Sequence, residues 1–359
     1  MKLTKYTIED HLSKLMPYNA INDYHAYPIR LDANESFINA DSNPWVNPSS
    51  LLSEVQYNRY PDPTCKKLIK AFSDYYSVSP DCVTVGNGSD ELIALICELF
   101  LEDKSTLLTT RPDFSMYSFY PYLRRAQVDY YIKPSTLDID ADALIDLVNQ
   151  VKPNILVFSN PCNPTGKMLG VESVLKIIEN SECLTIVDEA YMDFSSDYQS
   201  VIAKINNYEN LIVLKTASKF GFAALRLGFS VANKNLNRVL SSAKSPYNIN
   251  SICQILGEFA FKNSKSLNQN IDTIRNSRIQ LYEGLQKFHS VLNSPFIAIE
   301  SNTNFVYVKS LKCDAIFEEL KRAGILVRNF GDALRITCGT TYENSMLFST
   351  LNAINGGTL

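Results

Sequence analysis

Short apolar runs alternate with longer amphipathic segments from about residue 64 to residue 245. The apolar runs show no polar alternation, which is typical of strands buried on both faces. They are VTV (83–85), TLLTT (106–110), NILVFSN (154–160), LTIVDEA (184–190) and NLIVLKTAS (210–218). Helix patterns such as CKKLIKAFSDYYS (65–77) and GVESVLKIIENS (170–181) accompany them. This alternation predicts an α/β fold with a large, mostly parallel sheet flanked by helices.

The alternation ends at the proline-containing stretch KSPYNIN (244–250). A long helical region follows to about residue 290, and the remaining pattern is strand, helix, strand, strand, helix. We therefore expect a smaller α+β domain after the large one, because 359 residues exceed one typical core. The expected organisation is an N-terminal segment (1–45) that packs with the small domain, a large domain (46–245) and a small C-terminal domain (246–359).

Composition and charge exclude several classes of protein. The net charge is −4 and no basic block occurs, so neither nucleic acid nor an anionic membrane is expected as a partner. No apolar run reaches about 18 residues, and the charged first residues do not form a signal peptide. The eight cysteines form no C-x-x-C pair, which indicates a reducing cytoplasm. Three scattered histidines predict neither a metal site nor a Ser-His-Asp triad.

Polar residues follow each apolar run, and ligands of open α/β sheets gather at the carboxyl ends of strands. These residues are Gly86 to Glu91, Arg111 to Phe114, Asn160 to Gly166, Asp188 to Tyr191 and Ala217 to Lys219. Five strand ends are therefore expected to deliver polar groups to one edge of the sheet.

Each of these segments also has a simpler interpretation. The glycine turn, which contains Gly86 and Gly88, suits a phosphate. Taken alone, it is better explained as a plain turn with Ser89 as the helix N-cap. It is neither the dinucleotide fingerprint nor a P-loop. Taken alone, Asp188 and Glu189 are slightly better explained as strand-end carboxylates that cap the next helix, and Asn163 lies in a sequence of good turn residues.

Lys219 makes the combination specific. It lies among small and apolar residues, with no other charge until Arg226. A partly desolvated lysine is the nucleophile required for a Schiff base, and an arginine can hold a phosphate. An amine, an anion cradle and a carboxylate together match pyridoxal 5′-phosphate.

Eight motifs resemble those of fold-type I, class I/II aminotransferases, and within them the histidinol-phosphate aminotransferase branch. They are LDANES (31–36), NRYPDP (58–63), VGNGSDELI (85–93), NPCNPTG (160–166), VDEAY (187–191), KTASKFGFAALRLGF (215–229), SPYNIN (245–250) and LRITCGT (334–340). They span nearly the whole chain, and the order of the whole set is highly specific.

The resemblance implies the cofactor contacts. Lys219 forms the Schiff base, Asp188 pairs with the pyridine nitrogen, and Tyr191 bonds the phenolic oxygen. Asn163 bonds the same oxygen and Phe114 stacks on the ring. The residues around the phosphate are Gly88, Ser89, Asp90, Thr216, Ser218 and Arg226.

The resemblance also implies a homodimer, in which Tyr60 reaches the cofactor phosphate of the neighbouring subunit. The substrates are an amino donor and a 2-oxo acid, with Arg335 on the α-carboxylate. The substrate side is lined by Tyr18, Asn34 and Arg328.

The chain departs from the family pattern in four places. Cys162 occupies the third position of the commoner NPNNPTG, where its side chain is expected to point away from the site. The turn after Lys219 is one residue shorter than in the best-known members. The segment between Arg328 and Arg335 is also short, and MPYNAIND near the N-terminus keeps little beyond Pro-Tyr.

The favoured reaction converts L-histidinol phosphate and 2-oxoglutarate to imidazole-acetol phosphate and L-glutamate. A threonine-phosphate decarboxylase-like lyase and an aromatic amino-acid aminotransferase share the fold and most motifs, and stay open. A non-catalytic regulator would carry a basic helix-turn-helix segment, which the sequence does not show. A hydride-transferring dehydrogenase would carry the dinucleotide fingerprint, which is absent.

Overall fold

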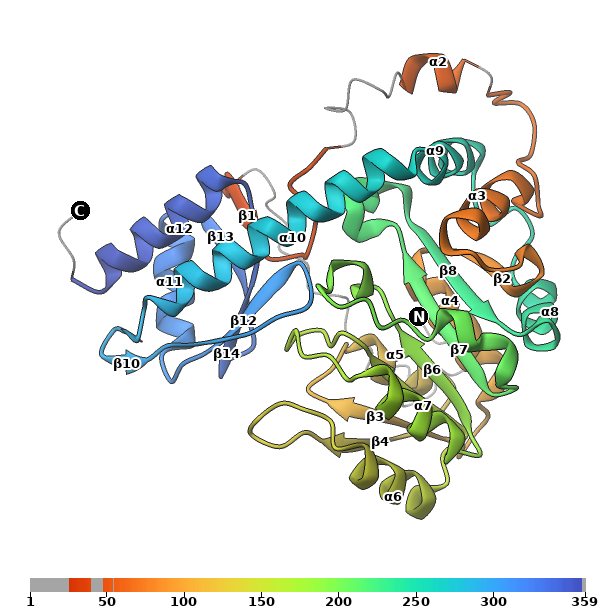
Figure 1. Cartoon of the computed structure of the whole chain (residues 1–359), viewed down its shortest axis with the longest axis horizontal. Helices are drawn as coiled ribbons and strands as arrows, with labels where there is room; N and C mark the ends of the chain where they lie inside the picture. Colours follow the sequence, from red (N-terminus) through yellow and green to blue (C-terminus); the bar gives the residue numbers. More distant parts are fainter. Residues whose placement is uncertain (1–25, 40–47, 54, 357–359) are drawn as a thin grey trace, which may run out of the picture.

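The computed structural model describes residues 26–39, 48–53 and 55–356. Two sheets dominate it (Figure 1). The larger one has seven strands in the order β2-β8-β7-β6-β5-β3-β4. Their bounds are β2 (Val83–Asn87), β3 (Thr106–Arg111), β4 (Gln127–Ile132), β5 (Ile155–Ser159), β6 (Leu184–Asp188), β7 (Leu211–Thr216) and β8 (Leu227–Ala232). All neighbours are parallel except those of β8, so the expected mostly parallel α/β sheet is confirmed.

Two strands of this sheet were not expected from the apolar pattern. β4 lies at the sheet edge and alternates exposed and covered residues, so it has no continuous apolar run. β8 contains Gly228 and Ser230 within its run, although every one of its residues is buried. Edge position and short polar interruptions hide both strands from a search for apolar runs.

Helices cover both faces of the large sheet. One face packs against α3 (Lys66–Tyr76), α6 (Ala141–Val151) and α7 (Val171–Glu179), and the other against α4 (Gly88–Phe100), α5 (Met116–Leu123) and α8 (Lys234–Ala243). The alternation along β5 shows the two cores. Leu156 and Phe158 belong to the first, and Ile155 and Val157 to the second. Strands buried on both faces therefore lack polar alternation.

The smaller sheet has the order β1-β13-β14-β12-β11. Its strands are β1 (Ile29–Leu31), β11 (Ile297–Ile299), β12 (Phe305–Lys309), β13 (Ile325–Asn329) and β14 (Ala333–Thr337). β1 pairs in parallel with β13, so a segment near the N-terminus joins a sheet built from the last third of the chain. The first strand expected after about residue 290 is in fact the antiparallel pair β11 and β12.

The long helical region consists of two helices, α9 (Ser251–Lys262) and α10 (Ser264–Gln286). α10 runs from the large sheet to the small one (Figure 1), where α11 (Cys313–Arg322) and α12 (Thr341–Ile354) also pack. The short elements are α2 (Pro48–Leu52), η3 (Pro80–Cys82), η4 (Met192–Phe194), η5 (Ile202–Asn207), η6 (Ser218–Phe222), η7 (Ala223–Leu225), β9 (Ser290–Val291) and β10 (Ser294–Pro295). Among the described residues, no helix combines the length and apolar character needed to cross a membrane.

The packing of β8 on α3 gives a stability prediction. The buried ring of Phe229 stacks on Phe72 with 4.0 Å between centroids. Phe229→Ala should lower the free energy of unfolding by about 3–5 kcal/mol, because it leaves a cavity beneath the helix. Ile132→Ala, at a side chain that is 64% exposed on the edge strand, should change it by less than about 0.5 kcal/mol. Urea denaturation followed by circular dichroism measures both, and equal losses would contradict this packing.

Candidate active site

The polar ends of five strands meet at one edge of the large sheet. β3, β5, β6 and β7 are parallel to one another. β2 runs in the same direction, because β2 and β7 are each antiparallel to β8. β8 begins at this edge, directly after Arg226. The predicted residues near 88, 114, 163, 188 and 219 therefore follow strands that end at the same edge. Tyr18 lies outside the described residues.

Lys219 presents a half-buried amine at this edge. Its Nζ lies 5.8 Å from the centre of the Tyr191 ring. Within the part of the chain that the structure describes, this amine makes no hydrogen bond and no ion pair. A lysine without a partner in a partly covered position is available for reaction with a ligand.

The hydroxyl of Tyr191 is held from the N-terminal segment. Asn34 Nδ2 donates a hydrogen bond of 2.8 Å to Tyr191 Oη, and both side chains are buried. Thr337 Oγ1, on β14, donates to Asn34 Oδ1 at 3.2 Å. Because the Tyr191 oxygen already accepts a hydrogen bond, its own proton is left to donate to a ligand. Asn34 therefore positions Tyr191 in this structure.

Asp188 ends the central strand β6 and is only 4% exposed. Its Oδ2 accepts a 2.7 Å hydrogen bond from the hydroxyl of Tyr117, and its Oδ1 accepts one of 3.0 Å from the Ala190 N–H. Burial raises the pKa of this carboxyl and the two hydrogen bonds lower it. Burial has the larger effect, so the resulting pKa is raised to about 6. The carboxylate is thus held ready for a cationic or protonated partner.

A buried carboxylate joins two other strand ends. Asp113 accepts hydrogen bonds from Ser159 Oγ and from the N–H of Phe114. Ser159 Oγ in turn accepts from the Asn163 N–H at 3.0 Å. The Lys133 ammonium lies 3.6 Å from Asp113 and compensates its charge. This network fixes the loops that carry the half-buried Phe114 ring and the Asn163 side chain.

The glycine turn and Arg226 lie against each other. Gly88 has a φ of +80°, and a Cβ there would lie 2.5 Å from Arg226 Nη2. The same nitrogen donates to Asp90 Oδ2 at 3.0 Å. Gly228 is packed on the Gly88–Ser89 peptide, so no side chain fits there either. The shortened turn after Lys219 still brings the arginine to the start of α4.

The hydroxyls predicted for the phosphate lie together. Thr216 Oγ1 is 2.9 Å from Ser218 Oγ and accepts from the Ser218 N–H. The alternative role of Ser89 as N-cap is wrong, because α4 begins at Gly88 and its N-cap is Asn87. Instead, the carboxylate of Glu91 reaches back to the Asn87 N–H, which leaves the Ser89 side chain out of the cap.

Arg335 connects the small sheet to the large one. Its Nη1 donates to Asn163 Oδ1 at 2.6 Å, and its Nη2 donates to the Asp32 carbonyl at 2.7 Å. Arg328 is its cross-strand partner in the β13–β14 register. Directly opposite residues share a face of the sheet, so both guanidinium groups lie on one side.

Tyr60, unlike the residues above, has a highly exposed side chain and, among the described residues, forms no hydrogen bond or ring contact with any of them. It is 80% exposed and stacks on Tyr247, with 4.6 Å between the ring centroids. Tyr247 belongs to SPYNIN, whose Asn248 bonds Glu91 in the first turn of α4. The exposed tyrosine pair is therefore tied to the same helix start as the glycine turn.

Cys162 faces Lys133. Its Sγ lies 2.9 Å from Lys133 Nζ and 3.6 Å from the Pro112 carbonyl. Burial alone lowers the pKa of Lys133, but Cys162 and Asp113 more than offset this and raise it. Cys162, which replaces the asparagine of the commoner NPNNPTG, thus forms a buried pair with Lys133 beside the Asn163 loop.

Two sets of residues near the site were missed in the sequence. Tyr117 lies in the aromatic stretch FSMYSFYPY, which indicates a core helix and gives no sign of a carboxylate partner. Lys215 lies behind the site, 3.1 Å from Glu189 and 3.2 Å from Asp193. Its only signal was a charged residue in an apolar strand. Glu189 therefore serves this buried ion pair.

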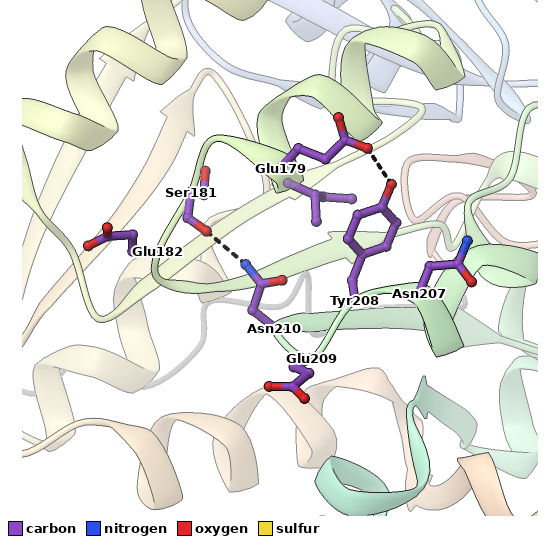
Figure 2. A pocket seen from close by; sticks show the side chains of 8 residues that line it. Glu179, Ser181, Glu182, Asn207, Tyr208, Glu209 and Asn210 are labelled. Atoms are coloured by element: carbon purple, nitrogen blue, oxygen red, sulfur yellow. Dashed lines mark hydrogen bonds between the residues drawn. The ribbon is translucent and has the colours of Figure 1, made fainter.

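A separate groove lies at the opposite, amino-terminal edge of the sheet. Figure 2 shows it between the end of α7 and the segment before β7, and its volume is about 520 Å³. It is lined by Ile178, Glu179, Ser181, Glu182, Asn207, Tyr208, Glu209 and Asn210. Tyr208 closes one side by donating to Glu179, and no predicted site residue takes part.

Comparisons with known proteins agree on one family. The family model for aminotransferases of class I and II matches residues 32–351. A histidinol-phosphate aminotransferase from Clostridium novyi (strain NT) is 38% identical over 346 residues, which cover 95% of this chain and 94% of that protein.

Solved structures show the same fold at lower identity. The histidinol-phosphate aminotransferase from Sinorhizobium meliloti in complex with pyridoxal-5′-phosphate has a TM-score of 0.86 at 20% identity, covering 99% of this chain and 98% of that one. L-threonine-O-3-phosphate decarboxylase from Porphyromonas gingivalis has a TM-score of 0.76 at 18% identity, covering 90% and 98%. Because both activities occur on this fold, the fold alone does not choose between them.

The burial of Asp188 gives a pH prediction. Its pKa is about 6 in the folded protein against an ordinary value of 3.8 for an aspartate, so this group's contribution to stability falls as pH rises through that interval. Asp188→Asn should therefore raise the free energy of unfolding of the protein without ligand at about pH 8, by at most about 3 kcal/mol. The gain should shrink towards about pH 4, where wild-type Asp188 is protonated.

Urea denaturation at the two pH values measures this difference. Asp74→Asn, at an exposed surface pair with Lys70, is the control and should change little. A variant at Asp188 that is less stable than wild type at both pH values would contradict the assignment of a strained, buried charge.

Proposed function

Because the chain belongs to the class I and II aminotransferases, we propose that it is a pyridoxal 5′-phosphate-dependent histidinol-phosphate aminotransferase. It moves the amino group of L-histidinol phosphate to 2-oxoglutarate, giving imidazole-acetol phosphate and L-glutamate. One observation carries the proposal. The half-buried amine of Lys219, which has no hydrogen-bond or ion-pair partner among the described residues, shares a sheet edge with the buried carboxylate of Asp188.

The residues present fit this cofactor. Gly88 and Gly228 leave a bare backbone surface beside Arg226, where a Cβ would collide. Free N–H groups at the start of α4, the hydroxyls of Thr216 and Ser218, and the Arg226 guanidinium form a donor set suited to a phosphate. When bound, pyridoxal phosphate supplies an aldehyde that condenses with amines and a ring that withdraws electrons from the substrate's α-carbon.

Each side chain then has a defined task. Lys219 Nζ would hold the cofactor through its aldehyde and would move a proton to and from the substrate's α-carbon. Asp188 keeps a proton on the ring nitrogen by accepting a charge-assisted hydrogen bond. Tyr191 donates to the ring's phenolic oxygen, because Asn34 already occupies its acceptor side. Asn163 would bond the same oxygen, and the ring of Phe114 would cover one face of the cofactor.

The substrate carboxylate is assigned to Arg335. Its two terminal nitrogens donate to Asn163 Oδ1 and to the Asp32 carbonyl, which holds the planar guanidinium beside the Asn163 loop. A 2-oxo acid can take its place in the planar fork. Arg328, on the same face of the sheet, is assigned to the second anionic group of either substrate. Tyr18 and Asn34 complete this side of the proposal.

The choice of histidinol phosphate is supported by the relative that is 38% identical over 95% of the chain. The proposal includes a cytoplasmic homodimer in which Tyr60 reaches the partner's cofactor phosphate. Its high exposure in a single chain and its link through Tyr247 to the phosphate end support this role. The eight cysteines are all unpaired, which suits a reducing compartment.

The chemistry can be tested at Lys219. Purified protein with pyridoxal phosphate is treated with borohydride, and the labelled peptide is identified by mass spectrometry. The label should lie on Lys219 and be absent from Lys219→Ala. Lys215→Met serves as the matched control, because that lysine is buried behind the site in an ion pair and should not carry the label. A label on another lysine would overturn the assignment.

The substrate can be tested with candidate amines. L-Histidinol phosphate with 2-oxoglutarate should yield glutamate, with a kcat/KM at least about tenfold above that of aromatic amino acids, because each such factor reflects about 1.4 kcal/mol of binding. Carbon dioxide release from threonine phosphate would instead establish the decarboxylase. Preference for an aromatic amino acid as the donor would establish an aromatic amino-acid aminotransferase.

Subunit mixing tests the position of Tyr60. Tyr60→Ala should weaken cofactor binding, because it removes a hydroxyl donor to the partner's phosphate. In a hybrid with Lys219→Ala, one site combines an intact Lys219 with an intact Tyr60, so activity should recover. The control is a mixture of Tyr60→Ala with a Tyr60→Ala, Lys219→Ala double variant, in which no site has both an intact Lys219 and an intact Tyr60. Equal activity in both mixtures would refute a tyrosine supplied across the interface.

A further inference from the structure

Tyr117 makes a contact that the family motifs do not assign. Its hydroxyl, from the first turn of α5, donates 2.7 Å to Asp188 Oδ2 at the end of β6. Tyr117 is fully buried and Asp188 nearly so. With the Ala190 N–H on Oδ1, each carboxylate oxygen has one protein donor, so the carboxylate cannot rotate freely.

We propose that Tyr117 is a positioning residue for the cofactor ring nitrogen, and that its hydroxyl keeps the Asp188 carboxylate ionised and in one orientation. The inference rests on the proposed function, since it requires the ring of pyridoxal phosphate to face Asp188. Tyr117 touches neither the substrate nor the cofactor in this account, and acts through Asp188.

The electrostatic surroundings give the hydroxyl a reason to be there. Burial raises the pKa of Asp188, and the carboxylates of Asp113, from the loop after β3, and Asp90, from α4, raise it further. The hydrogen bonds from Tyr117 and the Ala190 N–H act in the opposite direction. Without the hydroxyl, the Asp188 carboxyl would retain its proton at neutral pH and could not accept a charge-assisted hydrogen bond from a protonated ring nitrogen.

The donor also persists at every working pH. Burial and the neighbouring Asp188 carboxylate raise the pKa of Tyr117 well above its usual value. The phenol therefore remains protonated where the enzyme operates, and it cannot reverse its role as donor.

The ring of Tyr117 has a separate packing role. It meets the Phe114 ring edge-on, with 5.5 Å between centroids and 86° between planes. Tyr117→Phe keeps this packing and removes only the hydroxyl. Tyr76→Phe is the matched control, because Tyr76 likewise donates to a buried carboxylate, that of Asp193, at 3.0 Å, on the other side of the sheet. Both variants lose one hydroxyl–carboxylate bond, and only one loses it at Asp188.

The experiment measures the dissociation constant of pyridoxal phosphate between about pH 5 and pH 9 for wild type and both variants. Tyr117→Phe should shift the midpoint of the pH dependence upward by about one unit and weaken binding near neutral pH about tenfold. Tyr76→Phe should keep the wild-type midpoint. An analogue with carbon in place of the ring nitrogen should bind Tyr117→Phe as tightly as it binds wild type.

A second measurement does not need the cofactor. Infrared difference titration of the protein without ligand should show a protonated Asp188 carboxyl at higher pH in Tyr117→Phe than in wild type, with Asp188→Asn identifying the band. Identical titration and binding midpoints in the Tyr117 variant and wild type would overturn the inference while leaving the proposed function intact. If wild-type protein bound no pyridoxal phosphate, the proposed function and the inference would both fall.

Discussion

A negative charge held in the middle of a seven-stranded sheet is the constraint on which this site depends. Asp188 stands at the end of β6, the fourth strand of the sheet, where burial raises its pKa to about 6. An isolated carboxylate there is costly to bury. The backbone N–H of Ala190 and the hydroxyl of Tyr117 lower that cost, and a protonated ring nitrogen would lower it further. This destabilised carboxylate and the Lys219 amine, which has no polar partner in the described part of the chain, would both be satisfied by the proposed cofactor.

Strand direction brings these groups together. Five strands end at one edge, and β8 begins there, so its antiparallel direction places Arg226 beside the glycine turn. The small sheet adds its part through two contacts, Arg335 with Asn163 and Thr337 with Asn34. Since Arg335 and Thr337 are neighbours on the same face of β14, one strand contacts the Asn163 side chain and, through Asn34, the Tyr191 hydroxyl. Under the proposed function, this strand links the residue assigned to the substrate carboxylate with the tyrosine assigned to the cofactor.

The strands that are buried on both faces were predicted from the sequence, because short apolar runs without polar alternation are typical of such strands. The sequence did not predict β4, whose edge position gives alternating exposure, or β8, whose run contains Gly228. At the site, the residues directly after apolar strands were predicted, because strand direction alone determines which edge they reach. Tyr117 was missed, since a tyrosine in an aromatic helix looks like core until its hydroxyl is seen on Asp188. The backward reach of Glu91 to the start of α4 is likewise a tertiary detail, and it corrected the expected cap at Ser89.

The central claim is that one amine and one carboxylate at this edge hold opposite parts of the same cofactor. A crystal structure of the protein grown with pyridoxal phosphate tests it most directly. We expect continuous density from Lys219 Nζ to the cofactor, the ring nitrogen within hydrogen-bond distance of Asp188, and the phosphate at the start of α4 beside Arg226. Cofactor density elsewhere in the molecule, or a ring nitrogen turned away from Asp188, would contradict it.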